Sequence, residues 1–305
     1  MVAHLTDNPT STALILLPTR ELARQVEMAL RDMTAGRHGF HCANLIGGEP
    51  IGKQFFALKK RPRVIIGTPG RICDHLNRRS LDLENTHFLV LDEMDRMLDM
   101  GFTDALEEIV SHLPEDRQTL MFSATLPAYI EKQSHKYLST PIRIAIGSAE
   151  KPSVNIDQQL RQTSNGEKFS DLLDELDKRS GSIIVFVNTK RIADQLAEQL
   201  RDYDHRAEAI HGDLPQRKRE SVVRAFRAQK SRIMVATDVA ARGIDVPHVQ
   251  HVINYDLPLC PEDYIHRIGR TGRAGNEGQA LTLLTPVDEL SMRAIEKLTR
   301  SEERR

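Results

Sequence analysis

The sequence predicts an α/β fold of two tandem domains, each with a parallel β-sheet covered by helices on both faces. Short apolar runs alternate with amphipathic stretches, and this alternation occurs in both halves of the chain. A chain of 305 residues is long for one hydrophobic core and suits two domains of about 150 residues each. We expect domains at residues 1–146 and 156–305, joined by a polar linker with Gly and Pro at residues 147–155.

Apolar runs in the first half predict buried strands at residues 13–17, 42–46, 64–67, 88–92 and 119–122. Amphipathic stretches predict helices at residues 20–31, 71–78 and 103–112. The strands predicted in the second half are residues 182–187, 207–210, 232–236, 251–255 and 278–284. The helices predicted there are residues 191–201, 216–228 and 261–268. Because open α/β sheets bind ligands beyond the carboxyl ends of their strands, polar residues at those ends form the candidate site.

The composition is ordinary for a soluble protein and excludes a strongly basic body that binds nucleic acid by charge alone. Hydrophobic residues make up 40% and charged residues 28% of the chain, and the formal net charge is −1. Neither half is strongly basic, so any nucleic-acid site must be a local groove. The basic runs 59–63 and 217–219 either contribute to such a groove or are solvated faces.

Cysteine content and the start of the chain indicate a reducing, cytoplasmic setting. The three cysteines, Cys42, Cys73 and Cys260, are widely spaced, and no pair has metal-ligand spacing. The chain does not start with a basic segment followed by a long apolar run. The early apolar run 13–17 is far too short to span a bilayer.

A pair of carboxylates, Asp92 and Glu93, follows the apolar run 88–91. This pattern puts both acids just beyond the carboxyl end of a buried strand. In nucleotide hydrolases an Asp at this place holds Mg²⁺, usually through water, and the next Glu orients the attacking water. The alternative is a plain helix start, because acidic residues suit helix N-termini.

Two further segments have an arrangement that suits phosphate. Residues 18–23 (Pro-Thr-Arg-Glu-Leu-Ala) and 68–71 (Thr-Pro-Gly-Arg) each follow an apolar strand and open a predicted helix. Exposed N–H groups at a helix start bind phosphate, and Arg20 and Arg71 add positive charge. The segment Ser123-Ala124-Thr125 also follows a strand, and its hydroxyls suit a bond to Asp95, a helix N-cap, or both.

Residues 47–54 (Gly-Gly-Glu-Pro-Ile-Gly-Lys-Gln) nearly match a phosphate-binding P-loop. Gln54 stands where the loop needs a Ser or Thr hydroxyl for Mg²⁺, and Glu49 and Pro50 suit a phosphate cradle poorly. We interpret the match as a coincidence.

In their order along the chain, these motifs resemble the DEAD-box RNA helicases over nearly all 305 residues. The motifs are residues 18–23, 68–71, 92–95 (Asp-Glu-Met-Asp), 123–125, 238–245 (Asp-Val-Ala-Ala-Arg-Gly-Ile-Asp) and 266–273 (His-Arg-Ile-Gly-Arg-Thr-Gly-Arg). The resemblance implies two RecA-like domains, the first incomplete at its N-terminus, and an RNA-dependent ATPase that uses ATP and Mg²⁺. Domain closure on ATP would unwind short RNA duplexes, and single-stranded or duplex RNA would be held with little sequence preference.

The resemblance also implies residue roles. Asp92 and Glu93 are catalytic, and Arg270 and Arg273 resemble arginine fingers, whose planar guanidinium suits a γ-phosphate. Nucleotide or interface roles fall on Asp95, Ser123, Thr125, Gly243, Asp245 and His266. RNA-binding roles fall on Pro18, Thr19, Arg20, Gly47, Gly48, Thr68, Pro69, Gly70, Arg71, Asn188, His211, Gly212, Gln216, Arg219 and Thr237. The family usually has Ala at the position of Met94, so we expect this larger side chain to repack behind the site.

The family's P-loop and its adenine-recognising Gln segment are absent from these 305 residues. Only 12 residues precede Ala13, whereas a P-loop, its helix and the next connection need roughly 25–30 residues. One interpretation is an amino-terminally truncated helicase that is inactive on its own. The other is a nucleotide-independent RNA-binding scaffold derived from a helicase. Retention of Asp92, Glu93, Arg270 and Arg273 favours the first interpretation, and the close match to RNA-helicase motifs disfavours a DNA helicase.

Overall fold

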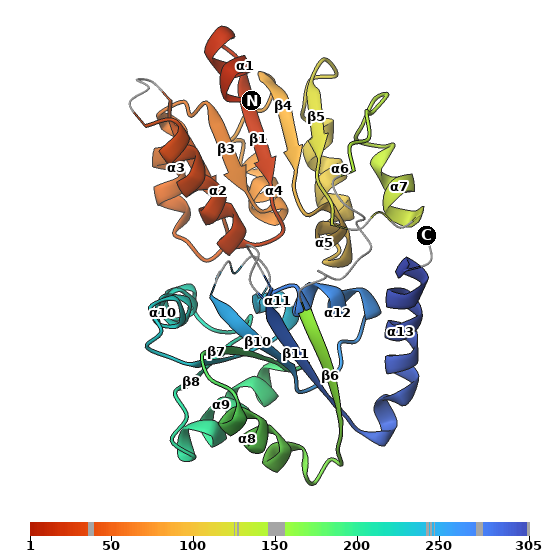
Figure 1. The fold of residues 1–305 in the computed structure, drawn as a ribbon. Helices are drawn as coiled ribbons and strands as arrows, with labels where there is room; N and C mark the ends of the chain where they lie inside the picture. Colours follow the sequence, from red (N-terminus) through yellow and green to blue (C-terminus); the bar gives the residue numbers. More distant parts are fainter. Residues whose placement is uncertain are drawn as a thin grey trace. The chain divides into compact units, whose positions relative to one another are not determined.

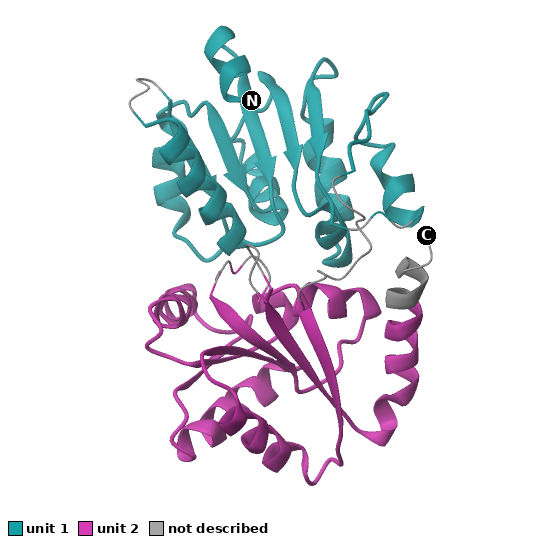
Figure 2. Ribbon diagram, viewed as in Figure 1, with its two compact units in different colours: residues 1–149 teal, residues 150–305 magenta. Residues whose placement is uncertain are grey.

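The structure, a computed structural model, describes residues 1–35, 40–124, 126, 128–145, 156–241, 244, 246, 248–272 and 277–303, with side chains up to residue 297. The chain divides into two compact units, unit 1 (residues 1–149) and unit 2 (residues 150–305), shown in Figure 2. Each unit is an α/β body with its own parallel sheet, which confirms the predicted fold class. The predicted linker 147–155 lies outside the described residues.

Unit 1 forms a parallel sheet with the strand order β2-β3-β1-β4-β5. Figure 1 labels its strands β3, β1, β4 and β5. The strands are β1 Thr12–Leu16, β2 Cys42–Leu45, β3 Val64–Gly67, β4 Thr86–Leu91 and β5 Gln118–Met121. The helices are α1 Val2–Asp7, α2 Arg20–Met33, α3 Ile51–Lys59, α4 Pro69–Asn77, α5 Met94–Asp99, α6 Thr103–Ser111 and α7 Ala128–Ser134.

Alternation along β1 builds the two cores of unit 1. Leu14 and Leu16 are fully buried in a cluster with residues of α4, α5 and α6. Ala13 and Ile15 point to the other face and pack with residues of α1 and α2. A strand that is apolar on both faces must be covered on both, and this is why the sequence shows continuous apolar runs rather than alternating ones.

Unit 2 forms a second sheet with the order β6-β11-β10-β7-β9-β8, and its described pairings are parallel. The strands are β6 Ile156–Gln162, β7 Ser182–Phe186, β8 Ala207–Ile210, β9 Ile233–Ala236, β10 Val249–Asn254 and β11 Gly278–Leu284. The helices are α8 Lys168–Lys178, α9 Lys190–Asp202, α10 Gln216–Arg227, α11 Asp238–Ala241, α12 Pro261–Ile268 and α13 Glu289–Glu303, with a short 3₁₀ turn η1 at Pro286–Asp288.

Residues of β7 divide between two cores in the same way. Ile183 and Val185 pack with α8 and α9, whereas Ile184 and Phe186 pack with α10 and α11. The strand β6 was not predicted, because its residues Ile-Asp-Gln-Gln-Leu-Arg-Gln are mostly polar and mostly exposed. As an edge strand of the sheet, β6 has polar side chains in solvent, which weakens the apolar signal that reveals buried strands.

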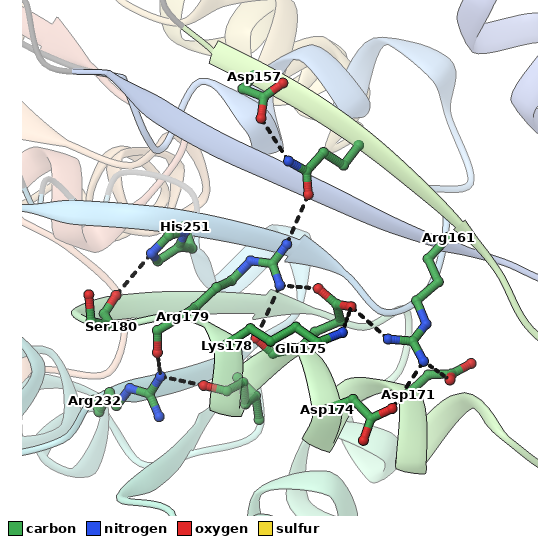
Figure 3. Close-up of polar contacts among 12 residues, drawn as sticks. Asp157, Arg161, Asp171, Asp174, Glu175, Lys178, Arg179, Ser180, Arg232 and His251 are labelled. Atoms are coloured by element: carbon green, nitrogen blue, oxygen red, sulfur yellow. Dashed lines mark hydrogen bonds and ion pairs between the residues drawn. The ribbon is translucent and has the colours of Figure 1, made fainter.

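A charged cluster joins β6 to α8 in unit 2 (Figure 3). The Glu175 carboxylate accepts hydrogen bonds from Arg161 at 2.6 Å, Lys178 at 3.0 Å, and Arg179. Burial alone would raise the pKa of Glu175, but the hydrogen bonds from Arg179, Lys178 and Arg161 outweigh it and lower the pKa from 4.5 to about 2. Because the folded pKa is depressed, the stabilisation is complete above the unfolded pKa and is lost as pH falls toward 2.

Replacing Glu175 by Gln is expected to lower the free energy of unfolding of unit 2 by about 2–3 kcal/mol at neutral pH. The loss should shrink as pH is lowered through the range below 4.5, where the wild-type carboxylate also gains a proton. Hydrogen exchange of unit 2 amides measures both effects. The control is Asp174→Asn, which removes a charge that also contacts Arg161 at 3.2 Å but is 61% exposed. Equal effects of the two substitutions, or a pH-independent loss, would contradict this account.

Candidate functional site

The predicted site residues of unit 1 gather beyond the carboxyl ends of its strands. Backbone hydrogen bonds tie these ends together: Asp92 N donates to Leu16 O at 3.0 Å, and Met94 N donates to Phe122 O at 2.9 Å. The loops after β1, β4 and β5 therefore begin side by side. This is the edge where a parallel α/β sheet binds its ligand.

The Asp92 carboxylate is partly withdrawn from solvent. Burial, followed by the negative charge of Asp95, raises the pKa of Asp92, while a hydrogen bond from Glu93 N at 3.0 Å opposes the rise. Asp95 itself is 3% exposed. Two carboxylates in a partly desolvated place suit a nearby cation, so the residues present fit a water-mediated Mg²⁺.

Glu93 has a left-handed backbone conformation, with φ 49° and ψ 53°. This conformation costs a non-glycine residue on the order of 1 kcal/mol or more and is common at functional sites. It turns the chain sharply from β4 into α5. Met94, the first residue of α5, is fully buried in the core with Leu89 and Leu91, as expected for a side chain that packs behind the site.

Ser123 lies just beyond β5 and is partly buried, whereas Thr125 lies outside the described residues. Within the described part of unit 1, β5 pairs with β4 and with no second strand. A groove of about 1090 Å³ runs along β5 and is lined on its far side by residues 137–142 and 144. The sheet thus has an open edge next to the strands that carry Asp92 and Ser123.

The loops after β1, β2 and β3 come together at the other end of this edge. A Cβ on Gly47 would lie 3.0 Å from the Arg20 guanidinium, so the turn and the arginine are in close contact. Arg71 donates to Glu49 O at 3.3 Å, and Arg24 pairs with the Glu49 carboxylate at 2.5 Å. The structure therefore unites three segments that are well separated in the sequence.

Burial divides the predicted RNA-binding residues of unit 1 into two groups. Pro18, Thr19, Thr68 and Pro69 are buried. Thr19 caps α2, because its hydroxyl accepts a hydrogen bond from Leu22 N at 3.3 Å. The solvent-facing members are Gly48 and Gly70, with Gly47, Arg20 and Arg71 partly exposed.

The P-loop-like stretch has a different structure from a phosphate cradle. Residues 51–59 form α3, and Gln54 on its first turn is 2% exposed. The Gln54 side chain bonds the backbone carbonyl of Ile46 at 2.8 Å and points into the protein rather than toward a ligand. This geometry agrees with the interpretation of the match as a coincidence.

In unit 2, a buried arginine that sequence analysis did not single out organises the carboxyl edge. Arg267 is 1% exposed. It donates two hydrogen bonds to the Asp238 carboxylate, at 2.6 and 2.7 Å, and one to Asp256 O at 2.5 Å. A further bond runs to Asn188 Oδ1 at 3.0 Å, and the guanidinium lies 5.1 Å from the Phe186 ring centroid.

The Arg267 cluster engages Asn188, one of the predicted RNA-binding residues. Asn188 Oδ1 accepts from Arg267, and its Nδ2 donates to Leu257 O at 2.8 Å. The Asp256 carboxylate accepts hydrogen bonds from Asn188 N at 3.0 Å and from the Lys168 ammonium at 2.8 Å. Asn188 thus connects β7, α12 and the loop after β10, and its RNA-binding role stays a prediction.

The other predicted RNA-binding residues of unit 2 also follow strand ends, but the side chains of several are buried. His211, Gln216 and Arg219 are 4%, 9% and 7% exposed. His211 Nε2 contacts the Asp194 carboxylate at 2.9 Å. Gly212 is exposed, and Thr237 is partly exposed.

His266 lies in α12 and Arg270 lies just after it, and both side chains are partly buried. Arg270 Nη1 donates to Ile244 O at 3.3 Å. Arg273, Gly243 and Asp245 lie outside the described residues. Arg267 precedes Arg270 by one helical turn, so a signal for it was present in the same motif.

Within the described residues, no group of three or more His, Cys, Asp or Glu side chains is placed to hold a metal ion. The three cysteines are free thiols. No helix in the part of the chain that the structure describes is long and apolar enough to cross a membrane.

Two family models match the chain. The model described as "DEAD/DEAH box helicase" matches residues 1–133, and the "Helicase conserved C-terminal domain" model matches residues 167–275. The DEAD-box ATP-dependent RNA helicase CshA of Bacillus subtilis (strain 168) is 44% identical over 295 residues, covering 96% of this chain and 60% of CshA. CshA of Geobacillus kaustophilus is 46% identical, covering 96% and 63%. The chain thus spans about 60% of the length of CshA of Bacillus subtilis.

Solved structures give the same result for both units. Saccharomyces cerevisiae Dbp5 bound to RNA and ADP BeF3 has a TM-score of 0.83 and 32% identity, covering 95% of this chain and 75% of that one. Mss116p bound to ssRNA and AMP-PNP has a TM-score of 0.85 and 29% identity, covering 97% and 65%. Both units therefore have the predicted RecA-like fold.

Proposed function

Because the chain belongs to the DEAD-box family of RNA helicases, we propose that it binds RNA through the sugar-phosphate backbone as part of an ATP-dependent RNA-remodelling protein. The observation that carries the proposal is the contact among the loops after β1, β2 and β3. That contact joins two arginines, Arg20 and Arg71, with the exposed glycines Gly48 and Gly70 on the edge that also holds Asp92 and Glu93.

The arrangement suits single-stranded RNA or a short duplex. Glycines admit close approach of a ribose-phosphate chain, and guanidinium groups pair with phosphate in planar, bidentate geometry. Backbone and 2′-hydroxyl contacts carry little base information, so binding should tolerate sequence. The RNA-bound state of Dbp5 supports this assignment for a related protein.

ATP and Mg²⁺ are the proposed cofactors. Bound Mg²⁺ would neutralise charge on the nucleotide phosphates, and Asp92 would hold it through water. Glu93 would orient the attacking water, and its left-handed conformation supports a constrained role beside Asp92. We assign unit 1 as the ATP-binding domain and unit 2 as the helicase C-terminal domain, with the linker at residues 147–155.

The phosphate loop has no counterpart in residues 1–305. The open edge of β5 and its groove suit an additional parallel strand, whose carboxyl end would lie beside Ser123. We propose that the 305-residue chain alone does not hydrolyse ATP at a useful rate, because the β- and γ-phosphates lack a cradle. The alternative function is nucleotide-independent RNA binding, which the same loops would support.

RNA binding is expected to be salt-dependent and insensitive to sequence. If about four phosphates are neutralised, the affinity for a labelled single strand should fall roughly 50-fold between about 50 and 200 mM salt. Fluorescence anisotropy with several unrelated single strands, without nucleotide, measures both properties. Arg71→Ala should weaken binding and flatten the salt dependence.

The matched control is Arg78→Ala, which removes the same charge at the far end of α4, where the Arg78 side chain is 55% exposed. This variant should bind like wild type. A strong preference among the unrelated strands, an affinity that is independent of salt, or equal effects of the two substitutions would count against the proposed RNA surface.

A further inference from the structure

We infer that Gln54 and His75 are positioning residues, which hold Arg71 and the turn at Gly47-Gly48 in the geometry that receives the RNA backbone. The inference rests on the proposed function of this surface. Neither residue needs to touch RNA, because both are buried, at 2% and 0% exposure. Their contacts connect the carboxyl end of β2 with α3 and α4.

The Gln54 side chain makes three hydrogen bonds. Its Nε2 donates to Ile46 O at 2.8 Å, directly before the glycine turn. Its Oε1 accepts from Arg71 Nη1 at 3.0 Å and contacts His75 Nε2 at 2.8 Å. One amide therefore joins the backbone that precedes the turn to the cationic group expected to meet phosphate.

These partners determine the proton positions. Ile46 O accepts only, so the amide nitrogen of Gln54 faces it and the amide oxygen faces His75. His75 Nε2 must then carry the proton. In the neutral ring Nδ1 accepts from the Ser80 hydroxyl at 2.8 Å, which shares its hydrogen with the His75 backbone carbonyl at 3.0 Å. Burial and the nearby Arg71 charge lower the pKa of His75, which keeps the ring neutral at physiological pH. The Asp74 carboxylate on α4 raises the pKa of His75, and Arg78 at the C-terminal end of α4 lowers it further.

Arg71 and the turn are held from several directions. Besides Gln54, Arg71 Nη1 reaches Glu49 O at 3.3 Å, and Nε lies 3.6 Å from the Asp74 carboxylate. Arg24 holds the Glu49 carboxylate at 2.5 Å. Gly48 has a φ of 76°, a left-handed conformation that glycine adopts without the strain a side chain would add. Among these contacts, the single side chain of Gln54 bonds both the backbone just before the turn and Arg71.

If Gln54 had only a packing role, its substitutions would have different effects on RNA binding. If Gln54 only filled space between α3 and the sheet, methionine of similar volume would replace it with little effect on RNA binding. If the amide positions Arg71, Gln54→Met should weaken RNA binding about tenfold, equivalent to about 1.4 kcal/mol. His75→Phe should act in the same direction, because it removes the Nε2 donor while preserving the ring against Phe55, which lies 5.5 Å away between centroids.

The test measures nucleotide-free affinity of the full 305-residue chain for a labelled oligouridylate strand, corrected for the folded fraction. His75→Gln keeps a donor near the Nε2 position and should restore most of the affinity lost in His75→Phe. The control for general destabilisation is Thr86→Val. It removes a hydroxyl contact with Thr12 at 2.9 Å, at the amino ends of β1 and β4 and therefore away from the proposed RNA surface. It should leave affinity unchanged.

A double substitution separates this inference from the proposed function. If Gln54 acts through Arg71, then Gln54→Met combined with Arg71→Ala should bind no more weakly than Arg71→Ala alone. No loss of affinity in Arg71→Ala refutes the RNA surface itself. Loss in Arg71→Ala with wild-type affinity in Gln54→Met and His75→Phe refutes the positioning role only. Additive losses in the double variant also refute it.

The imidazole provides a readout that does not depend on a variant folding. In ¹⁵N spectra of histidine-labelled wild-type protein, His75 should be neutral and protonated at Nε2 at physiological pH. Observation of the Nδ1-protonated tautomer would overturn the hydrogen-bond chain from Ser80 through His75 to Gln54.

Discussion

Replacing Arg270 by Ala is expected to lower RNA-stimulated ATP turnover by about 10³-fold or more, the contribution of arginine fingers in related phosphoryl-transfer enzymes. The experiment uses a chain extended at its N-terminus by a segment with a Gly-x-x-x-x-Gly-Lys-Ser/Thr loop. The unextended 305-residue chain is the blank and should show no turnover that depends on Glu93. Arg273 should behave like Arg270, as the motif resemblance implies.

The physical reason is charge that develops on the γ-phosphate in the transition state. A guanidinium is always charged and bidentate, so Arg270→Lys should rescue turnover poorly although it keeps the charge. RNA affinity without nucleotide should change little in either variant. Single-turnover hydrolysis and RNA affinity are therefore measured side by side. An effect on turnover below about tenfold, or parallel loss of RNA affinity, would assign Arg270 to RNA binding or to structure instead.

Replacing Arg267 by Met is expected to lower the free energy of unfolding of unit 2 by about 3–5 kcal/mol, the usual effect of removing one partner from a buried ion pair. The substitution preserves apolar volume but leaves the Asp238 carboxylate, Asn188 Oδ1 and Asp256 O without their guanidinium donor. These groups lie on three different segments, so the damage should spread across the carboxyl edge.

Hydrogen exchange of the amides in β7 and β10 measures this loss within unit 2. Arg293→Met is the matched control, because Arg293 is 68% exposed and forms an ion pair with Glu289 one turn earlier on α13. It should change stability by no more than about 0.5 kcal/mol. If the amides of β7 and β10 were equally protected from hydrogen exchange in Arg267→Met and Arg293→Met, the Arg267 cluster would contribute little to the stability of unit 2.

Local pattern was sufficient to predict ten of the eleven strands and six of the thirteen α-helices in the described part of the chain. The buried strands β3, β7 and β9, and β1 after its first residue, are almost continuous apolar runs, because both faces of a parallel strand are covered. The same pattern located Asp92 and Glu93 beyond β4. Residues of one motif are neighbours in the chain, so their order could be recognised without any knowledge of tertiary contacts.

The limits of sequence analysis are visible at individual residues. The strand β6 was missed because its exposed edge position is occupied by polar side chains. The helices α1, α3, α5, α7, α8, α11 and α13 were not predicted. Of these, α1, α5, α7 and α11 have four to seven residues, too few to show a helical period. His211, Gln216 and Arg219 were assigned to RNA by motif, and burial could not be inferred from their polar character.

The sequence by itself determined the fold class and the family, because both depend on apolar periodicity and on short contiguous motifs. Only the tertiary structure decided which polar side chains are held inside. Arg267 joins partners at positions 188, 238 and 256, and Gln54 joins positions 46, 71 and 75. A polar side chain is stable in the interior only when all such partners converge on it, and that convergence is a property of the folded chain rather than of any local segment.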